Sequence, residues 1–305
     1  MTAYIIRRLL QTVPALLGIV LVTFFLVRLT GDPARLVLGE GATEQAVLAL
    51  RQSLGLNDPV LTQFLRFLGG VLRGDFGTSI RYREPVLGLF WERVPATLEL
   101  GLAAYLLAVS AGITVGVYSA LRWNTTQDRL IRLLVLVGQA VPGFYLGLLA
   151  IILFGVHWRL LPTGGRGTPA HLVLPAATLA LFLAALIVRF TRSMVLDVLR
   201  ADYVRTARAK GLPPRTVITR HLLRNALIPL ITVLAAQTSV LFSGAVVTET
   251  VFAWPGIGRF AVQAISTRDF PLIQATVLIL TSVVLLLNLL VDVAYVWLDP
   301  RITYQ

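Results

Sequence analysis

The hydrophobic positions of this chain gather in long runs, which short, polar, arginine-bearing segments separate. An α-helix needs about 20 mainly apolar residues to cross a bilayer. Stretches that meet this requirement lie at residues 9–29, 97–121, 130–156, 172–188, 227–247 and 275–298. The pattern therefore predicts an all-α integral membrane protein with six transmembrane helices.

The first apolar stretch is expected to stay in the mature protein. It is rich in β-branched residues near its end and lacks a small-x-small cleavage pattern before Gly31-Asp32-Pro33. A secretory signal peptide has a shorter apolar run followed by such a site. Residues 1–29 are therefore interpreted as a short tail and a retained transmembrane helix.

The charges between the stretches predict the orientation of the chain. Short cytoplasmic loops of membrane proteins carry an excess of Lys and Arg. Arg7 and Arg8 precede the first span and place the N-terminus in the cytoplasm. Residues 122–132 and 189–224 then lie on the same side, and the second of these segments holds nine basic and two acidic residues. Six spans also return the C-terminus to the cytoplasm.

Residues 30–96 form the long segment predicted to lie outside the cell membrane, and they hold seven basic and seven acidic residues. This segment is longer than a connection needs to be, and residues 43–54 and 59–72 have helical patterns before glycines interrupt them. We expect a small extracytoplasmic helical subdomain here, followed by a core domain at 97–305 with the other five spans. Two interpretations of the subdomain stay open: a packed lid, and a docking surface for a delivery protein.

Composition agrees with a membrane protein and excludes several functions. The chain is 56% hydrophobic and 14% charged, with a mean hydropathy of +0.79, whereas soluble domains are about 25% charged. Its net charge of +12 comes from arginines that flank apolar runs, which is typical of membrane proteins rather than nucleic-acid binders. The single lysine, Lys210, lies between Ala209 and Gly211, so the Gly-Lys-Ser/Thr of a P-loop is absent. We expect no cofactor in this chain.

An intramembrane protease is the enzyme class to test against this pattern. A serine version needs a histidine within a span, but His157, His171 and His221 all fall outside the predicted spans. An aspartyl version needs two facing carboxylates, and only Asp292 lies well within a span. The chain also lacks cysteines and clustered metal ligands. The sequence therefore predicts neither a catalytic residue nor a metal site.

Several polar side chains nevertheless fall inside the predicted spans. They are Gln139, Gln237, Ser239, Ser243 and Asn288. Polar groups are costly in lipid, so these side chains are expected to face the protein interior or a wet cavity. Helix–helix hydrogen bonding and lining of a translocation path both remain open. The Val141-Pro142-Gly143 sequence after Gln139 is expected to weaken or kink its helix.

A basic hairpin at residues 189–226 separates the fourth span from the fifth. Residues 193–210 have a helical pattern, Gly211 suits the left-handed position that ends a helix, and Pro213-Pro214 suits the start of another. The second helix is expected to continue into the fifth span and to bend at Pro229. Such a hairpin is a stiff lever, and the alternative is a simple cationic loop.

The hairpin resembles the cytoplasmic motif of binding-protein-dependent ABC importer permeases, and is most similar to the first-subunit type of the dipeptide, oligopeptide and nickel family. The general motif is Glu-Ala-Ala, three residues, Gly, nine residues and Ile-x-Leu-Pro. The corresponding positions here hold Arg205-Thr206-Ala207, Gly211 and His221-Leu222-Leu223-Arg224, and in the Glu-Ala-Ala and Gly part only Ala207 and Gly211 match. Further resemblance lies at residues 54–67, 74–79, 249–259 and 268–274.

The resemblance implies a type I ABC importer-like fold and a transport function in a bacterial or archaeal cell (inner) membrane. The hairpin would dock as a coupling helix on an ATPase that binds ATP and Mg. The residues implied in this contact are Asp202, Tyr203, Arg205, Thr206, Ala207, Lys210 and Gly211. The implied partners are a second homologous permease, two ABC ATPase subunits and an extracytoplasmic substrate-binding protein.

The resemblance also implies the class of cargo, which is peptides, with nickel chelates and glutathione as alternatives. A different class of transport protein, a stand-alone secondary transporter, is the alternative to an importer subunit. Ion-coupled carriers generally keep carboxylates at mid-membrane, and the predicted spans contain almost none. The sequence therefore favours an importer subunit that is moved by a separate ATPase.

Overall fold

The computed structural model describes residues 2–29, 32–38, 41–53, 55–213 and 216–298. These residues form helices and turns without a β-strand, apart from one isolated bridge between Thr78 and Pro85. The chain divides into two compact units, which we call the terminal unit (Met1–Pro95 with Gly256–Gln305) and the central unit (Ala96–Pro255). The all-α prediction is confirmed for the described residues.

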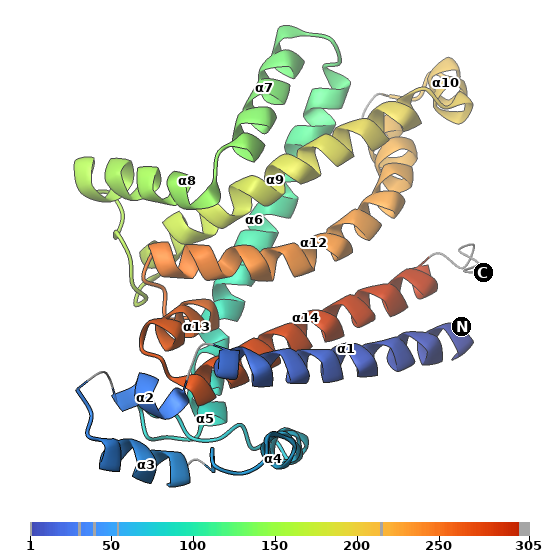
Figure 1. Cartoon of the computed structure of the whole chain (residues 1–305). Helices are drawn as coiled ribbons and strands as arrows, with labels where there is room; N and C mark the ends of the chain where they lie inside the picture. The colour runs from blue at the N-terminus through green and yellow to red at the C-terminus, as the bar shows by residue number, and fades with distance from the viewer. Residues whose placement is uncertain (1, 30–31, 39–40, 54, 214–215, 299–305) are drawn as a thin grey trace. The chain divides into compact units, whose positions relative to one another are not determined.

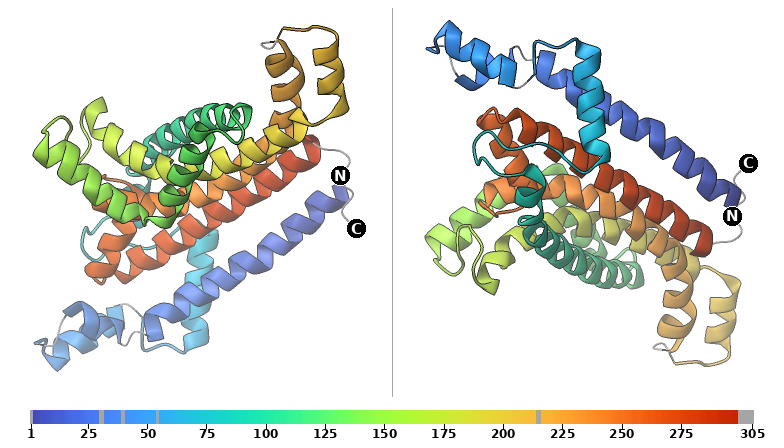
Figure 2. Two further views of the ribbon diagram at one scale, coloured as in Figure 1. Left: turned by 90° about the horizontal axis from the view of Figure 1, so that it is seen from above. Right: turned by 90° about the horizontal axis from the view of Figure 1, so that it is seen from below.

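The helices of the terminal unit come from both ends of the chain (Figures 1 and 2). They are α1 (Thr2–Leu29), α2 (Pro33–Leu38), α3 (Glu44–Ser53), α4 (Val60–Leu72), α5 (Val86–Trp91), α13 (Ile257–Ser266) and α14 (Phe270–Leu298). The predicted helices at 43–54 and 59–72 are thus present as α3 and α4. The predicted extracytoplasmic segment packs with α13 and α14, which the sequence did not indicate.

The central unit holds the remaining elements. They are α6 (Val94–Leu121), α7 (Thr126–Ala140), α8 (Gly143–Ala150), the π-helix η1 (Ile151–His157), α9 (Pro169–Leu199), α10 (Asp202–Ala209), the π-helix η2 (Val217–Leu223) and α12 (Arg224–Val251). Within the described residues, three helices are long and apolar enough to cross a membrane: Val86–Leu121, Pro169–Leu199 and Phe270–Leu290. The count of six spans stays a prediction.

The stretch predicted as one span at 130–156 consists of two helices that meet at the predicted kink. The axes of Thr126–Ala140 and Gly143–His157 are bent by 102°. Val141 between them is extended (φ −82°, ψ 127°), because a residue before proline is driven out of the α region. The predicted kink is confirmed and is stronger than a simple bend.

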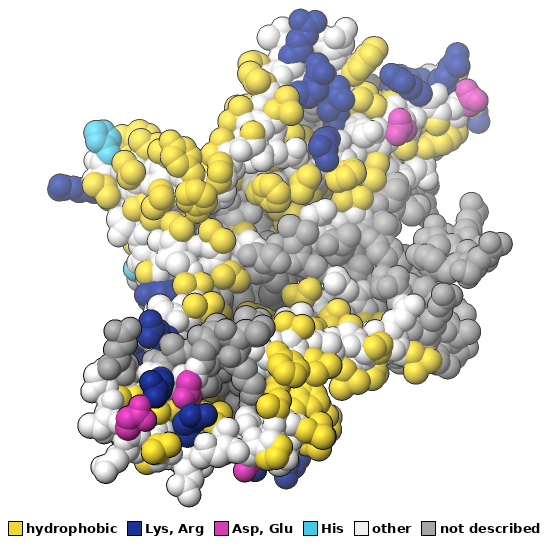
Figure 3. Space-filling view, viewed as in Figure 1, with side chains coloured by type: hydrophobic (Ala, Val, Ile, Leu, Met, Phe, Trp, Pro, Cys, Tyr) yellow, Lys and Arg dark blue, Asp and Glu magenta, His cyan; other side chains and the backbone are white. Residues whose placement is uncertain are grey.

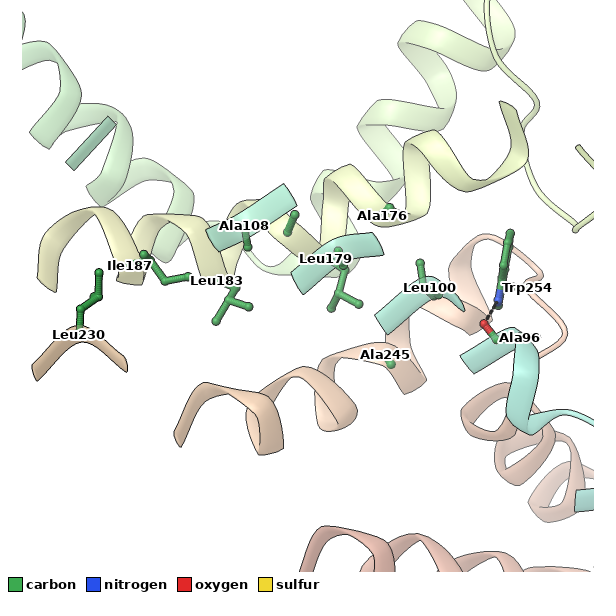
Figure 4. Packing of buried hydrophobic residues seen from close by; sticks show 12 residues of the cluster. Ala96, Leu100, Ala108, Ala176, Leu179, Leu183, Ile187, Leu230, Ala245 and Trp254 are labelled. Carbon is green, nitrogen blue, oxygen red and sulfur yellow. Dashed lines mark hydrogen bonds between the residues drawn. The ribbon is translucent and has the colours of Figure 1, made fainter. Parts of the chain in front are cut away.

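The core of the central unit is a seam between α6, α9 and α12 (Figure 4). Small residues recur every fourth position on α6, so its backbone approaches α9 closely. Those with little or no exposure are Ala96, Ala104, Ala108, Gly112, Gly116 and Ala120. A Cβ on Gly112 would lie 2.6 Å from Cβ of Ile187, and one on Gly116 would lie 2.6 Å from Cβ of Thr191.

We expect Gly112→Ala to destabilise the protein by about 2 kcal/mol, because overpacking a close contact forces the two helices apart. The matched control is Gly143→Ala on α8, where an added Cβ meets nothing within 4 Å. Thermal unfolding of the purified protein, followed by tryptophan fluorescence, measures the difference. Equal unfolding midpoints for the two variants would contradict the close contact.

The terminal unit contains a buried carboxylate that fastens the loop after α4. Asp269 accepts hydrogen bonds from Ser79 Oγ at 2.5 Å, from the Ile80 amide at 3.2 Å and from the Arg81 amide at 3.1 Å. It also caps α14, since the Leu272 amide donates to Asp269 Oδ1 at 3.3 Å. Residues 74–79 and 268–274 are therefore brought together by this carboxylate.

We expect Asp269→Ala to release the 79–83 loop, because three donors lose their acceptor. The buried Ser79 hydroxyl is then left without its carboxylate, and an unpaired buried donor costs about 1–3 kcal/mol. Limited trypsin digestion measures the release as faster cleavage after Arg81 or Arg83. The control is Asp58→Ala, since Asp58 pairs with the exposed Arg66 at 2.6 Å. A digestion rate unchanged from that of the unmodified protein would show that other contacts hold the loop.

Candidate functional site

The basic hairpin is built from three helical pieces. α9 continues to Leu199, the chain is extended at Ala201 (φ −68°, ψ 144°), and α10 begins at Asp202. The single helix predicted at 193–210 is therefore wrong. The break turns the apolar side of α10 back toward the other arm, where Val204 and Ala207 pack against Val217.

The turn of the hairpin follows the prediction at Gly211. Gly211 has φ +73°, a left-handed conformation that favours glycine. Its amide donates to Arg208 O at 3.0 Å, and the Leu212 amide donates to Ala207 O at 3.3 Å. These two bonds make a Schellman motif. The second arm starts where the Thr216 amide donates to Pro213 O at 2.9 Å, while Pro214 and Arg215 lie outside the described residues.

The second arm joins a long helix without a break. η2 runs directly into α12, which is curved (Figure 1). At this junction Leu222 and Ala226 pack with Val195 of α9 and Ala120 of α6. The hairpin is thus anchored to α6 and α9 at its base. The predicted bend at Pro229 stays a prediction.

The seven residues implied in the contact with an ATPase differ in how exposed their side chains are. Six of them are exposed: Asp202, Tyr203, Arg205, Thr206, Lys210 and Gly211. Ala207 is buried inside the hairpin, so it packs the arms together and does not present its side chain to a partner. Figure 3 shows basic side chains gathered over α10 and over the α6–α7 turn.

A buried ion pair fixes the α6–α7 turn to α9 next to the hairpin. Asp128 is fully buried and accepts from Arg192 Nε at 2.7 Å and Arg192 Nη2 at 2.9 Å. Ser119 Oγ donates to Asp128 at 2.7 Å, and the Asn124 amide donates at 3.1 Å. The hydrogen bonds from Arg192 hold the pKa of Asp128 well below its usual range, although burial opposes this shift.

The sequence did not single out this clamp, by which we mean the Asp128–Arg192 pair. One signal was available, since Asp128 is an acidic residue in a segment with Arg122, Arg129 and Arg132. Arg132 lies 3.7 Å from Asp128 as well. That pattern does not indicate that the partner of Asp128 is Arg192, which lies 64 residues away in the chain.

Two of the five polar residues predicted in spans have described, buried side-chain atoms in the central unit. Gln139 Nε2 and Gln237 Oε1 are buried and have no hydrogen-bond partner among the described atoms. Both residues lie on helices that pack against α9. Asn288 is exposed on α14, in the terminal unit, and the side chains of Ser239 and Ser243 lie outside the described residues. Lining of a path stays a prediction for all five.

The stretch from Glu249 onward closes one end of the central unit. Glu249 is fully buried, and its Oε1 accepts from Thr97 Oγ1 at 2.7 Å. Trp254 Nε1 donates to Ala96 O at 2.8 Å (Figure 4). These bonds tie the end of α12 to the start of α6, so this part of the motif is structural.

Two models of known protein families match this chain, one over its N-terminal third and one over most of the rest. The model described as "binding-protein-dependent transport system inner membrane component" matches residues 112–304. The N-terminal model of such a transport-system membrane component matches residues 1–101.

Curated relatives match this chain along its full length, and the match also covers 100% of each relative. The dipeptide transport system permease proteins of Alkalihalophilus pseudofirmus and Escherichia coli K12 are each 39% identical to this chain. The glutathione transport system permease protein of Salmonella paratyphi A is 42% identical.

Solved structures share the fold. A chain of the MetNI methionine ABC transporter in an inward-facing conformation has a TM-score of 0.58 at 19% identity, with 70% of this chain and 97% of that chain covered. A chain of an amino acid ABC transporter has a TM-score of 0.54 at 18% identity, with 68% and 93% covered.

Proposed function

Because the chain belongs to the family of binding-protein-dependent transport system inner membrane components, we propose that it is a permease subunit of an ATP-driven peptide importer. The observation that carries this proposal is full-length identity of 39% to dipeptide permeases and 42% to a glutathione permease. The subunit has no P-loop of its own, so ATP and Mg bind to partner ATPase subunits. It is a multi-pass protein of the bacterial inner membrane.

We propose six spans with both termini in the cytoplasm. The arrangement within the central unit supports this orientation, since the α6–α7 turn and α10 lie at the same end of it (Figure 1). Both segments are rich in arginine, as cytoplasmic loops are. The segment at 30–96 then lies on the extracytoplasmic side, where a substrate-binding protein delivers the peptide.

The hairpin is proposed to dock on the ATPase through its exposed side chains. Their set is Asp202, Tyr203, Arg205, Thr206, Lys210 and the backbone at Gly211. Closure of the ATPase pair on ATP moves the hairpin, and the packing of Leu222 and Val195 carries that movement into α12 and α9. The clamp makes the α6–α7 turn move with α9. This motion switches the membrane subunits between outward- and inward-facing states.

The translocation path is proposed to form between this chain and a second, homologous permease. Gln139 and Gln237 are the best supported lining residues, because each leaves a buried polar atom without a partner. Peptide backbones offer amide donors and carbonyl acceptors that match such side chains. Ser239, Ser243 and Asn288 complete the proposed set.

Reconstitution tests the proposal directly. The purified chain is expected to hydrolyse no ATP by itself, and the assembly with its second permease, ATPases and binding protein is expected to take up labelled dipeptide only with ATP. Competition with glutathione and with a nickel chelate then ranks the cargo; glutathione is the second candidate because the 42% relative carries that name. ATP hydrolysis by the purified chain, or dipeptide uptake without an ATPase, would overturn the proposal.

A further inference from the structure

Helix α4 has two apolar sides and one polar side. Its aromatic side contains Phe64 and Phe67, and its leucine side contains Leu61, Leu65, Leu68 and Leu72. The leucines follow the i, i+4, i+7, i+11 spacing of one helical stripe. Thr62, Arg66 and Arg73 lie on the third side, on the flank of the leucine stripe that faces away from the two phenylalanines. The helix therefore has a wide apolar arc and a narrow polar arc.

The aromatic side is covered by α1. Phe24 of α1 lies 5.2 Å from Phe64 and 5.9 Å from Phe67, measured between ring centroids. Phe24 itself is 2% exposed. The contact lies near the C-terminal end of α1, which is where a transmembrane helix leaves the hydrocarbon.

Among the residues that the structure describes, three leucines of the leucine side have no such cover. Leu61, Leu65 and Leu72 are 68%, 56% and 78% exposed. Hydrophobic side chains accordingly gather over α4 in the space-filling view (Figure 3). A row of leucines this exposed to water would be unfavourable by about 1.5–3 kcal/mol for each side chain left unburied.

The surroundings of this stripe indicate lipid as its cover. Near the contact with α4, α1 also leaves Leu21 and Phe25 exposed, so the apolar surface continues from the span onto α4. α4 runs across α1, since Figure 1 shows α1 from the side and α4 end-on. A helix that runs across a span in this way lies along the membrane surface and not through it. An amphipathic helix in that position buries its apolar side in the headgroup and acyl boundary.

We propose that α4 is an interfacial helix that lies flat on the membrane and inserts Leu61, Leu65 and Leu72 into the lipid at the C-terminal end of α1. Its polar side, with Thr62 and Arg73, faces water. This role fastens the segment at 30–96 to the bilayer surface beside α1. It depends on the chain being embedded in a membrane and is independent of which cargo the importer carries.

Spin labelling tests this inference, because the chain has no cysteine and accepts single ones cleanly. The labelled positions are Leu65→Cys and Leu72→Cys on the leucine side, Thr62→Cys on the polar side, and Leu17→Cys on α1 as a lipid reference. The assembled importer is placed in lipid nanodiscs, and label accessibility to oxygen and to a water-soluble nickel chelate is measured. Oxygen concentrates in lipid, whereas the chelate stays in water.

The ratio of oxygen to chelate accessibility is expected to be several-fold higher at Leu65 and Leu72 than at Thr62, and to approach the value at Leu17. A high chelate accessibility at the leucine positions would mean that the stripe faces water and would overturn the proposal. Low accessibility to both reagents would mean that a protein, such as the second permease or the delivery protein, covers the stripe, which also overturns it. Uptake by each labelled importer confirms that the variants are folded.

Discussion

Gly211→Pro is expected to abolish ATP-driven uptake while leaving the chain in the membrane. Proline fixes φ near −65°, whereas Gly211 has φ +73°. Proline also removes the amide that donates to Arg208 O at 3.0 Å. The Schellman turn cannot form, so the exposed face of α10 no longer has a fixed direction. Uptake and ATP hydrolysis in proteoliposomes measure the result.

Two further variants at Gly211 distinguish an effect of backbone conformation from an effect of side-chain size. An added Cβ at Gly211 meets nothing within 4 Å, so any effect there comes from the backbone conformation. Asn tolerates the left-handed region and is expected to retain most uptake, while Ala is strained by about 1 kcal/mol and is expected to be intermediate. If Gly211→Pro takes up cargo as fast as the unmodified protein, the hypothesis that the hairpin acts as a lever is wrong.

Asp128→Ala is expected to cost about 3 kcal/mol of stability, since breaking a buried pair strands the other charge. Arg192 would lose two hydrogen bonds, and Ser119 would lose its acceptor. Tryptophan fluorescence during thermal unfolding measures the loss. The control is Asp202→Ala, whose partner Arg205 lies 3.7 Å away in an exposed pair and is expected to contribute under about 1 kcal/mol.

The clamp also has a defined pH dependence. A carboxyl pKa that is lowered in the folded state stabilises the protein above the ordinary value of 3.8, and this stabilisation is lost as the pH falls below that value. The stability difference between the unmodified protein and Asp128→Asn is therefore expected to be constant from about pH 8 to pH 5. A difference that shrinks between pH 7 and pH 5 would indicate that Asp128 titrates there and that Arg192 does not hold it ionised.

Local signals in the sequence predicted local structure well. Periodicity placed α3 and α4 within a few residues, and Gly211 marked the turn, because each feature depends on neighbours in the chain. The extent of α9 was underestimated: its apolar run weakens after Val188, but arginine favours helices, and Met194 and Val195 continue the buried side to Leu199.

Long-range contacts were not predictable in the same way. The Asp128–Arg192 pair spans 64 residues, and the Ser79–Asp269 pair spans 190. An isolated carboxylate in the sequence does not indicate its partner, since hydrophobic periodicity carries no information on which helices become neighbours. The resemblance to importer permeases did mark residues 74–79 and 268–274, although not that they meet.

The Ser79–Asp269 pair also has a consequence for the order in which the protein is made. The ribosome synthesises Ser79 long before Asp269, which lies 190 positions later, and the segment between them contains all of the central unit. The central unit can therefore complete its packing during synthesis, while the loop at residue 79 waits for its anchor. A chain that stops short of residue 269 would therefore leave the loop at residue 79 without the carboxylate that fastens it.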